Sequence, residues 1–326
     1  MRIVNGSAAF SAATAVSVTI GNFDGVHLGH QELLRRTVAR AKSTGTAPVA
    51  LTFSPHPVRF FSPKARFYEI TSLEEKAERI AGFGIEALVV ESFTGEVGRM
   101  DPVKFAGEIL ALRLRARYAI VGYDFTFGRN RSGSPAMLAG IGRELGFEVE
   151  VVPSLVRGGL IVSSTRIREL LLAGRVREAE ELMSRPYRVS GVVVAGAGRG
   201  RKLGYPTANI QFTQELIPLP GVYIVEAEVA GVRRRAVANV GFNPTFGENS
   251  FGVETHLMGF HGDLYGQEVA IHFRDRIRDE RKFKSVEELV RQIEKDVRYA
   301  AGARFPDRIE PGGRAPDSAA AGGSAG

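Results

Sequence analysis

Two imidazole side chains three residues apart are the first sign of chemistry in this sequence. His27 and His30 close a glycine-rich run, residues 21–30, which reads GNFDGVHLGH. Residues 31–41 have apolar side chains at helical spacing, so we expect a helix directly after it. The beginning of a helix has free backbone N–H groups and a partial positive charge, which favour a bound phosphate. Besides the histidines, the residues expected around that phosphate are Gly21, Phe23, Gly25 and Gly29.

The chemistry that suits this turn is attack on the α-phosphate of a nucleoside triphosphate. Transfer of a nucleotidyl group needs positioning and charge stabilisation more than a nucleophile from the protein. The two histidines would donate to phosphate oxygens and steady the developing charge. A histidine pair at this spacing also arises by chance or as metal ligands. Zinc is disfavoured because no third ligand has suitable spacing nearby.

A second polar cluster, residues 163–168, supports the same hypothesis. Ser163, Ser164 and Thr165 provide hydroxyl groups at the expected beginning of another helix, and Arg168 lies one turn further on. Hydroxyl groups at a helix N-terminus and a guanidinium can together hold a departing pyrophosphate. The alternative is a simple helix cap followed by surface arginines.

A third polar run, residues 198–209, reads GRGRKLGYPTAN. Gly198 and Gly204 make its backbone flexible, and its basic residues favour the binding of an anion such as a phosphate group. The Thr207 hydroxyl and the Asn209 carbonyl are oxygen ligands of the kind that Mg²⁺ prefers. The run lacks the GxxxxGK[ST] pattern of a Walker A loop, so a basic surface turn is the alternative. Two phosphate sites on one chain indicate two ATP-using steps.

The first half of the chain alternates strand and helix patterns, which predicts an α/β domain with a doubly wound, Rossmann-like parallel sheet. The turn with the two histidines would join the first of these strands to the first helix. The expected strands are residues 15–20, 48–53, 87–90, 118–122 and 147–152. The expected helices are residues 31–41 and 73–83, one that begins at Asp101 and Pro102, and one from Ser163 to Gly174.

After residue 186, short strands separated by glycine-rich turns replace this alternation, which predicts a small antiparallel β-barrel or sandwich. One amphipathic helix follows, with Ser285 and Glu288 as a capping box, and runs to about Arg298. We expect domains at residues 1–185 and 186–302, and a disordered tail at residues 303–326. The expected strands include residues 188–194, 221–229, 234–240 and 269–273.

Composition narrows the class of protein. The formal charge is +7, but no block of five or six like charges occurs, so phosphorylated small ligands are favoured over a nucleic-acid-binding tail. The chain has no Cys, which excludes disulfides and thiolate catalysis. No run of 18 apolar residues occurs, and the start has no apolar signal core. We therefore expect a cytoplasmic protein with no membrane span.

The first two motifs together resemble the adenylyltransferase half of the bacterial bifunctional riboflavin kinase/FMN adenylyltransferase family. The HxGH turn also occurs in cytidylyltransferases and pantetheine-phosphate adenylyltransferases, so the more specific matches are residues 52–57, TFSPHP, and 121–128, VGYDFTFG. In an alternative interpretation, the phenylalanines of the second match are core residues of a strand, where alternate positions face the same side. By the resemblance, the residues beside the flavin ring are Phe53, Asp124, Phe125 and Phe127.

Residues 204–209, which read GYPTAN, resemble a motif of the riboflavin kinase domain of the same family, whose Thr and Asn contact Mg-ATP. Residues 239–247 and 263–266 match that domain too. The resemblance makes Glu254 the general base, which takes the proton from the ribityl 5′-hydroxyl as it attacks the γ-phosphate. The alternative is a solvated carboxylate on a strand. Met258 and Gly259 depart from the acidic or bulkier residues expected after this segment.

The resemblance covers about residues 14–300 and implies a bifunctional enzyme. It would phosphorylate riboflavin to FMN with Mg-ATP and then adenylylate FMN to FAD, with release of pyrophosphate. Riboflavin, FMN and ATP are the expected partners, without nucleic acid or membrane, and the expected state is a monomer or weak homo-oligomer. The alternatives are an enzyme with one half degenerate, a nucleic-acid-binding module, and a nucleotidyltransferase for a lipid or coenzyme A precursor.

Overall fold

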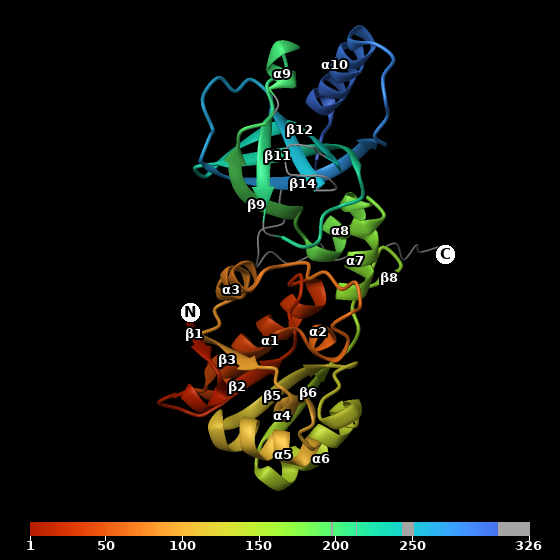
Figure 1. Cartoon of the computed structure of the whole chain (residues 1–326). Helices are drawn as coiled ribbons and strands as arrows, with labels where there is room; N and C mark the ends of the chain where they lie inside the picture. Colours follow the sequence, from red (N-terminus) through yellow and green to blue (C-terminus); the bar gives the residue numbers. More distant parts are fainter. Residues whose placement is uncertain (197, 213, 243–250, 306–326) are drawn as a thin grey trace, which may run out of the picture.

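The computed structural model of the chain describes residues 1–196, 198–212, 214–242 and 251–305. A parallel sheet with its helices makes up the lower part of Figure 1, and a small barrel the upper part. The two parts correspond to the two patterns in the sequence. The prediction of an α/β domain followed by a small antiparallel β-barrel and a C-terminal helix is therefore confirmed.

The six-stranded sheet has the order β1-β4-β3-β2-β5-β6, and every neighbouring pair is parallel. Both faces are covered, because alternate residues of β3 point into different cores. Val49 and Leu51 belong to one core cluster, and Ala50 belongs to the other. This is the doubly wound arrangement. The strands are β1 (Arg2–Asn5), β2 (Val16–Ile20), β3 (Ala47–Ser54), β4 (Ala87–Ser92), β5 (Ala116–Gly122) and β6 (Glu148–Val152).

The helices of this part follow the strands along the chain. The first, α1, ends at Gly45, whose left-handed φ of 67° a residue with a side chain rarely adopts. The helix expected from Asp101 is a short α-helix that continues as a π-helix, Phe105–Arg113. The α-helices are α1 (Leu28–Thr44), α2 (Pro57–Phe61), α3 (Leu73–Ala81), α4 (Gly95–Gly98), α5 (Pro102–Lys104) and α6 (Pro135–Leu145). The short elements are the 3-10 turns Ser7–Ala9 and Arg129–Arg131 and the hairpin β7 (Val156–Arg157) and β8 (Leu160–Ile161).

The barrel closes in the order β10-β13-β12-β11-β14-β9, and all of its pairs are antiparallel. Closure removes the free edges that a sandwich would keep. The C-terminal helix α10 (Val286–Gly302) is one turn longer than predicted, and Ser285 caps it. The strands are β9 (Tyr187–Val194), β10 (Ala208–Phe212), β11 (Gly221–Val229), β12 (Val232–Phe242), β13 (Phe251–Leu257) and β14 (Glu268–Arg278), and α9 is Arg199–Lys202.

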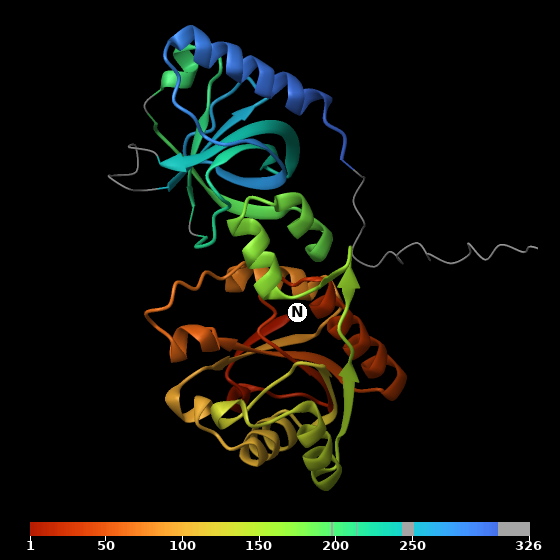
Figure 2. The same ribbon diagram turned by 90° about the vertical axis from the view of Figure 1, so that its right-hand side faces the viewer.

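Two helices, α7 (Ser164–Leu172) and α8 (Val176–Met183), lie between the sheet and the barrel (Figures 1 and 2). Their apolar side chains share one core cluster with the inside of the barrel, for example Leu170 with Phe273. One continuous core therefore runs across residue 185. After α10, Arg235 donates to the carbonyl oxygen of Ala303 at 2.8 Å.

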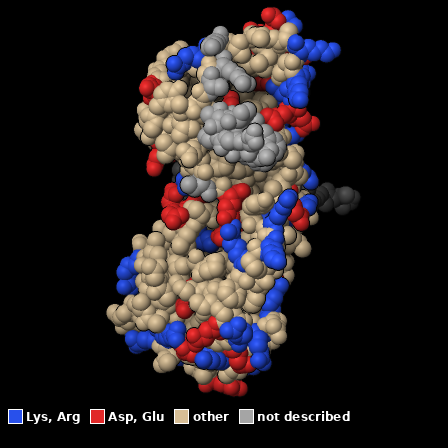
Figure 3. Space-filling model, in the orientation of Figure 1, with Lys and Arg blue, Asp and Glu red and all other residues tan. Residues whose placement is uncertain are grey.

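Figure 3 shows basic and acidic side chains interspersed on one face of both parts, which fits a charge of +7 without a block of like charges. Where the two parts meet, Arg188 of β9 donates to Glu78 of α3 at 3.0 Å.

Among the described helices, none has the length and apolar composition needed to cross a membrane.

Candidate active sites

The turn between β2 and α1 has an unusual backbone. Phe23 and Val26 have left-handed φ angles of 49° and 38°, and Gly25 has a φ of 81°. A left-handed φ is costly for a residue with a side chain, above all a β-branched one, and such strain persists only where surrounding contacts hold it. At Gly25 a Cβ atom would also lie 3.1 Å from the Ile70 Cδ1 atom. The position therefore needs glycine for two reasons.

His27 caps α1 with its side chain. Its Nδ1 atom accepts the backbone N–H of His30 at 3.3 Å, so the proton of the neutral ring is on Nε2. Burial, with the charge of Arg185 in addition, lowers the pKa of His27 to about 3. His27 is thus a neutral donor whose N–H direction is set by the cap. Gly29 leaves room for it, because a Cβ atom there would lie 3.2 Å from the His27 Cε1 atom.

The ring of His30 stacks on that of His27, with centroids 3.6 Å apart and an angle of 17° between the planes. Phe23 meets His30 edge-on at 5.3 Å. Burial lowers the pKa of His30 well below its usual value, and the charges of neighbouring groups add to the effect. The buried Nδ1 atom of His30 has no hydrogen-bond partner among the described residues. An unpaired buried polar atom is costly, so it marks a place for a ligand.

Asp24, inside the same turn, joins three segments of the chain. Its Oδ1 atom accepts the backbone N–H groups of Ile70 at 2.9 Å and Thr71 at 3.2 Å. Its Oδ2 atom accepts Arg168 Nη2 at 2.7 Å, and its carbonyl oxygen accepts the Ser164 hydroxyl at 2.8 Å. Burial raises the pKa of Asp24, against the lowering effect of Arg168 and of Lys76. The sequence analysis did not select Asp24, although a carboxylate within a glycine-rich turn was a visible signal.

The beginning of α7 lies beside the histidine turn. Ser163 caps this helix by accepting the Arg166 N–H at 3.2 Å, as expected, and Thr165 is exposed. Arg168 is already engaged, because it pairs with Asp24 and donates to the Tyr68 carbonyl at 2.8 Å. The structure thus brings together the residues predicted to bind the phosphates of one nucleotide. Contact between Arg168 and a pyrophosphate remains a prediction.

The predicted flavin residues join an aromatic cluster at the ends of β3 and β5. Phe53 lies 6.4 Å from Phe105, which lies 5.5 Å from Phe127, measured between ring centroids. Phe125 stacks on Phe127 at 5.4 Å and 14°. The interpretation of these two residues as alternate positions on a strand is wrong, since β5 ends at Gly122 and they lie in the following loop. Phe127 is buried and Asp124 is exposed.

The second site is a row of polar side chains across three barrel strands. Glu254 on β13 is the register partner of Asn209 on β10 and of Asn239 on β12. Its neighbours Val253 and Thr255 are buried inside the barrel, so the row faces outward. Asn239 Nδ2 donates to a carboxylate oxygen of Glu280 at 3.0 Å. Of the predicted match at residues 239–247, residues 243–247 lie outside the described chain.

The GYPTAN loop packs closely around its own glycines. Gly198 and Gly204 have left-handed φ angles of 64° and 84°. At Gly200 a Cβ atom would lie 2.3 Å from the Tyr205 carbonyl oxygen and 3.3 Å from Thr207 Oγ1. His256 lies two residues after the predicted base. Its Nδ1–H donates to the Pro206 carbonyl at 2.9 Å, because a carbonyl oxygen can only accept. The sequence analysis missed His256.

Thr207 and Asn209 suit a magnesium ion. The backbone of Gly196 packs against the Asn209 amide, since a Cβ atom on Gly196 would lie 2.1 Å from Asn209 Nδ2. Within the described residues there is no cluster of three or more His, Cys, Asp or Glu side chains that could hold a metal. Mg²⁺ commonly takes only one or two protein ligands and completes its shell with water and substrate phosphates. A hydroxyl and an amide oxygen fit that pattern.

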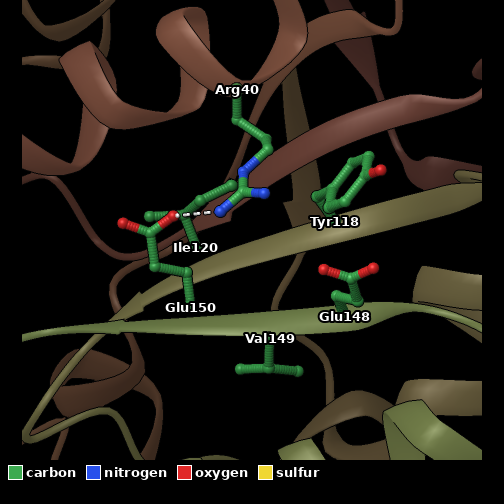
Figure 4. Close-up of a pocket in the computed structure, with 6 residues that line it drawn as sticks. All are labelled: Arg40, Tyr118, Ile120, Glu148, Val149 and Glu150. Carbon is green, nitrogen blue, oxygen red and sulfur yellow. Dashed lines mark hydrogen bonds and ion pairs between the residues drawn. The ribbon is translucent and has the colours of Figure 1, made fainter. Parts of the chain in front are cut away.

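The hollow drawn in Figure 4 lies away from both sites. Its volume is about 30 Å³, which suits about one water. Arg40 pairs with Glu150 at 3.1 Å and lies over the ring of Tyr118, so the hollow is a notch beside an ion pair.

Comparison with known proteins identifies the family of both halves of the chain. A family model described as FAD synthetase matches residues 10–166, and one described as riboflavin kinase matches residues 183–303. A bifunctional riboflavin kinase/FMN adenylyltransferase of Pseudomonas fluorescens is 37% identical, over 88% of this chain and 93% of that protein. The chain belongs to this family. The proteins of the same name from Listeria monocytogenes and Escherichia coli are 36% and 34% identical, and each match covers 86% of this chain and 89% or 90% of the relative.

The family gives both halves of the chain a catalytic role. The prediction of a bifunctional enzyme of flavin cofactor synthesis is confirmed, since both family models match. A solved structure titled a macrolide-efflux protein, from Streptococcus pneumoniae, superposes with a TM-score of 0.87 and 31% identity, over 93% of this chain and all of that one. The arrangement of the two halves therefore recurs in a solved chain.

Proposed function

We propose that the barrel half makes the phosphate that the N-terminal half then joins to AMP. The observation that carries this proposal is that each half holds its own cluster of polar groups. His27 and His30 stack at the beginning of α1 in the N-terminal half, and Glu254 and Asn209 belong to the outward-facing row of the barrel. We assign the adenylyltransferase to residues 1–185 and the kinase to residues 186–302.

In the kinase step, Glu254 takes the proton from the ribityl 5′-hydroxyl of riboflavin as that oxygen attacks the γ-phosphorus of ATP. The bond between the γ-phosphorus and the β–γ bridging oxygen breaks, and ADP leaves. Thr207 and Asn209 hold Mg²⁺, which neutralises charge on the ATP phosphates when bound. His256 supports them by holding the Pro206 carbonyl, one residue before Thr207.

In the adenylyl step, a phosphate oxygen of FMN attacks the α-phosphorus of a second ATP in line. The bond to the β-phosphate breaks and pyrophosphate leaves, so no covalent enzyme intermediate is needed. His27 and His30 donate as neutral imidazoles, because burial keeps the pKa of each far below neutrality. Two positive charges beside this turn, those of Arg168 and Lys76, both act on Asp24.

The proposal also covers where the flavin ring binds, the compartment of the enzyme and its oligomeric state. The FMN ring lies against the aromatic cluster, and the residues predicted to contact it are Phe53, Asp124, Phe125 and Phe127. The absence of Cys suits the reducing cytoplasm, where we place the enzyme. We expect a monomer or weak homo-oligomer, which gel filtration at several protein concentrations tests. A single stable large assembly at every concentration would contradict it.

The direct test is incubation of the full chain with riboflavin, ATP and Mg²⁺, followed by chromatography. We expect FMN to appear first and FAD after it, and EDTA to stop the formation of both. FAD without FMN as an intermediate would contradict the order, and FMN formation in excess EDTA would contradict the role of Mg²⁺.

A further inference from the structure

Arg185, at the junction of the two halves, binds the histidine turn. It lies two residues before β9 and is the last residue of the N-terminal half, although the match to the riboflavin kinase model begins at residue 183. Its Nη2 atom donates to the Gly25 carbonyl at 2.6 Å, and its Nη1 atom donates to the Val26 carbonyl at 3.2 Å. Nη1 also lies 3.3 Å from the Met183 carbonyl. The last residue of the N-terminal half, at its junction with the barrel, thus binds the backbone of the histidine turn.

The two carbonyls belong to the most strained part of that turn. Gly25 and Val26 have φ angles of 81° and 38°, and the second is costly for valine. Gln31 of α1 assists, since its Nε2 atom donates to the Val26 carbonyl at 3.1 Å and to the Met183 carbonyl at 3.0 Å. Residues 183–185 and the turn therefore form one hydrogen-bonded unit. His27 follows Val26 directly. The hydrogen-bonded unit therefore fixes the backbone position from which the His27 imidazole extends.

The guanidinium suits this task better than other side chains. It presents five N–H donors in a rigid fork, which reaches two neighbouring carbonyls at once, whereas an ammonium acts as a point donor. Burial lowers the pKa of Arg185 to about 9, so it remains a cation at neutral pH. Its charge also contributes to the lowered pKa values of His27 and His30, after the larger effect of burial.

We propose that Arg185 is a positioning residue for adenylyl transfer, which holds the Gly25 and Val26 carbonyls so that the two imidazoles face the reacting phosphate. This inference rests on the proposed role of the histidine turn. It implies that the adenylyltransferase depends on a residue at the junction with the barrel, where the match to the riboflavin kinase model has already begun. Arg185 itself touches neither substrate in this account.

The test uses the full chain, with both activities measured on each preparation. For Arg185→Ala we expect kcat for FAD formation from FMN to fall on the order of 100-fold, the size of effect that misplacement by about 1 Å produces. The KM for ATP should change much less, since the loss concerns the transition state. FMN formation from riboflavin should stay near the wild-type rate and shows that the variant is folded.

Two further variants separate positioning from a structural role. Arg185→Lys should recover part of the lost kcat, because the lysine ammonium supplies the charge and N–H donors on a single nitrogen but not the planar fork. Arg188→Ala is the matched control, because Arg188 lies at the same junction and donates to Glu78 at 3.0 Å without contact to the turn. It should keep both activities.

Three outcomes would overturn the inference: wild-type kcat for FAD formation in Arg185→Ala, an equal fall in both activities, or an equal effect of Arg188→Ala. A His27→Ala/His30→Ala double variant is measured beside them. FAD formation retained in that double variant would refute the proposed role of the turn. FAD formation lost there but normal in Arg185→Ala refutes only the inference about Arg185.

Discussion

Asn209 and Glu254 lie directly opposite each other on the neighbouring antiparallel strands β10 and β13. Residues in such register have Cβ atoms about 5 Å apart and point to the same face of the sheet. The proposed magnesium ligand and the proposed general base are therefore neighbours by strand pairing, although 45 positions separate them in the sequence. The barrel therefore fixes the relation between these two side chains before any substrate binds.

The hydrogen bond between His256 and the Pro206 carbonyl should be measurable in the kinase reaction. In His256→Asn the amide nitrogen can replace Nδ1, whereas in His256→Gln it lies nearer the place of Nε2. We expect the Gln variant to raise the KM for ATP roughly fivefold, the equivalent of about 1 kcal/mol for one lost hydrogen bond. The Asn variant should stay close to wild type. Equal KM values in the two variants would show that this hydrogen bond does not position the ATP loop.

The His27 ring should stay neutral, with its proton on Nε2, at pH values well below those at which histidine usually becomes protonated. Burial lowers its pKa to about 3 in the fold, whereas an unfolded chain protonates histidine near pH 6.5. The unfolded state then binds more protons, so this residue's contribution to stability is lost as the pH falls below about 6.5. Nitrogen-15 NMR, with His27→Asn for assignment, should show the Nε2–H tautomer still at pH 5.5. A charged ring at that pH would contradict the buried cap.

Gly29→Ala and Gly140→Ala should have opposite effects, although both glycines lie in helices. A Cβ atom on Gly140 of α6 meets no atom within 4 Å, so alanine there should stabilise the fold by about 0.5–1 kcal/mol. On Gly29 the new methyl group would lie 3.2 Å from the capping ring of His27. We expect FAD formation in Gly29→Ala to fall on the order of tenfold with FMN formation unchanged. Thermal melts and the two assays check this, and normal FAD formation would show that the cap has room to move.

The fold could be predicted from the sequence because its signals are local. Apolar spacing marked the strands and helices, and Ser163 and Ser285 act as the caps that were expected. The choice between barrel and sandwich stayed open, because it depends on which distant strands pair. The closing pairs join β9 to β10 and to β14, and nothing in either strand alone specifies its partner.

The motifs of both sites were visible, but the contacts that hold them were not. Asp24 meets Arg168 across 144 positions, and Arg185 meets Gly25 across 160. Such pairs leave no periodic signal. The phenylalanines 125 and 127 do lie together, but in a loop whose course depends on the contact between Phe127 and Gly133. Sequence patterns thus identified the groups that could do chemistry, and long-range packing decided their geometry.

Paired variants test whether two separate sites act in turn. His27→Ala/His30→Ala should lower FAD formation from FMN by at least about 100-fold and leave FMN formation from riboflavin near wild type. Glu254→Gln should lower FMN formation on the order of 100-fold or more and leave FAD formation from supplied FMN intact. Chromatographic rates of both products from folded proteins give the answer. If either variant loses both activities equally, or if each keeps the activity assigned to its altered site, the account of two separate sites is wrong.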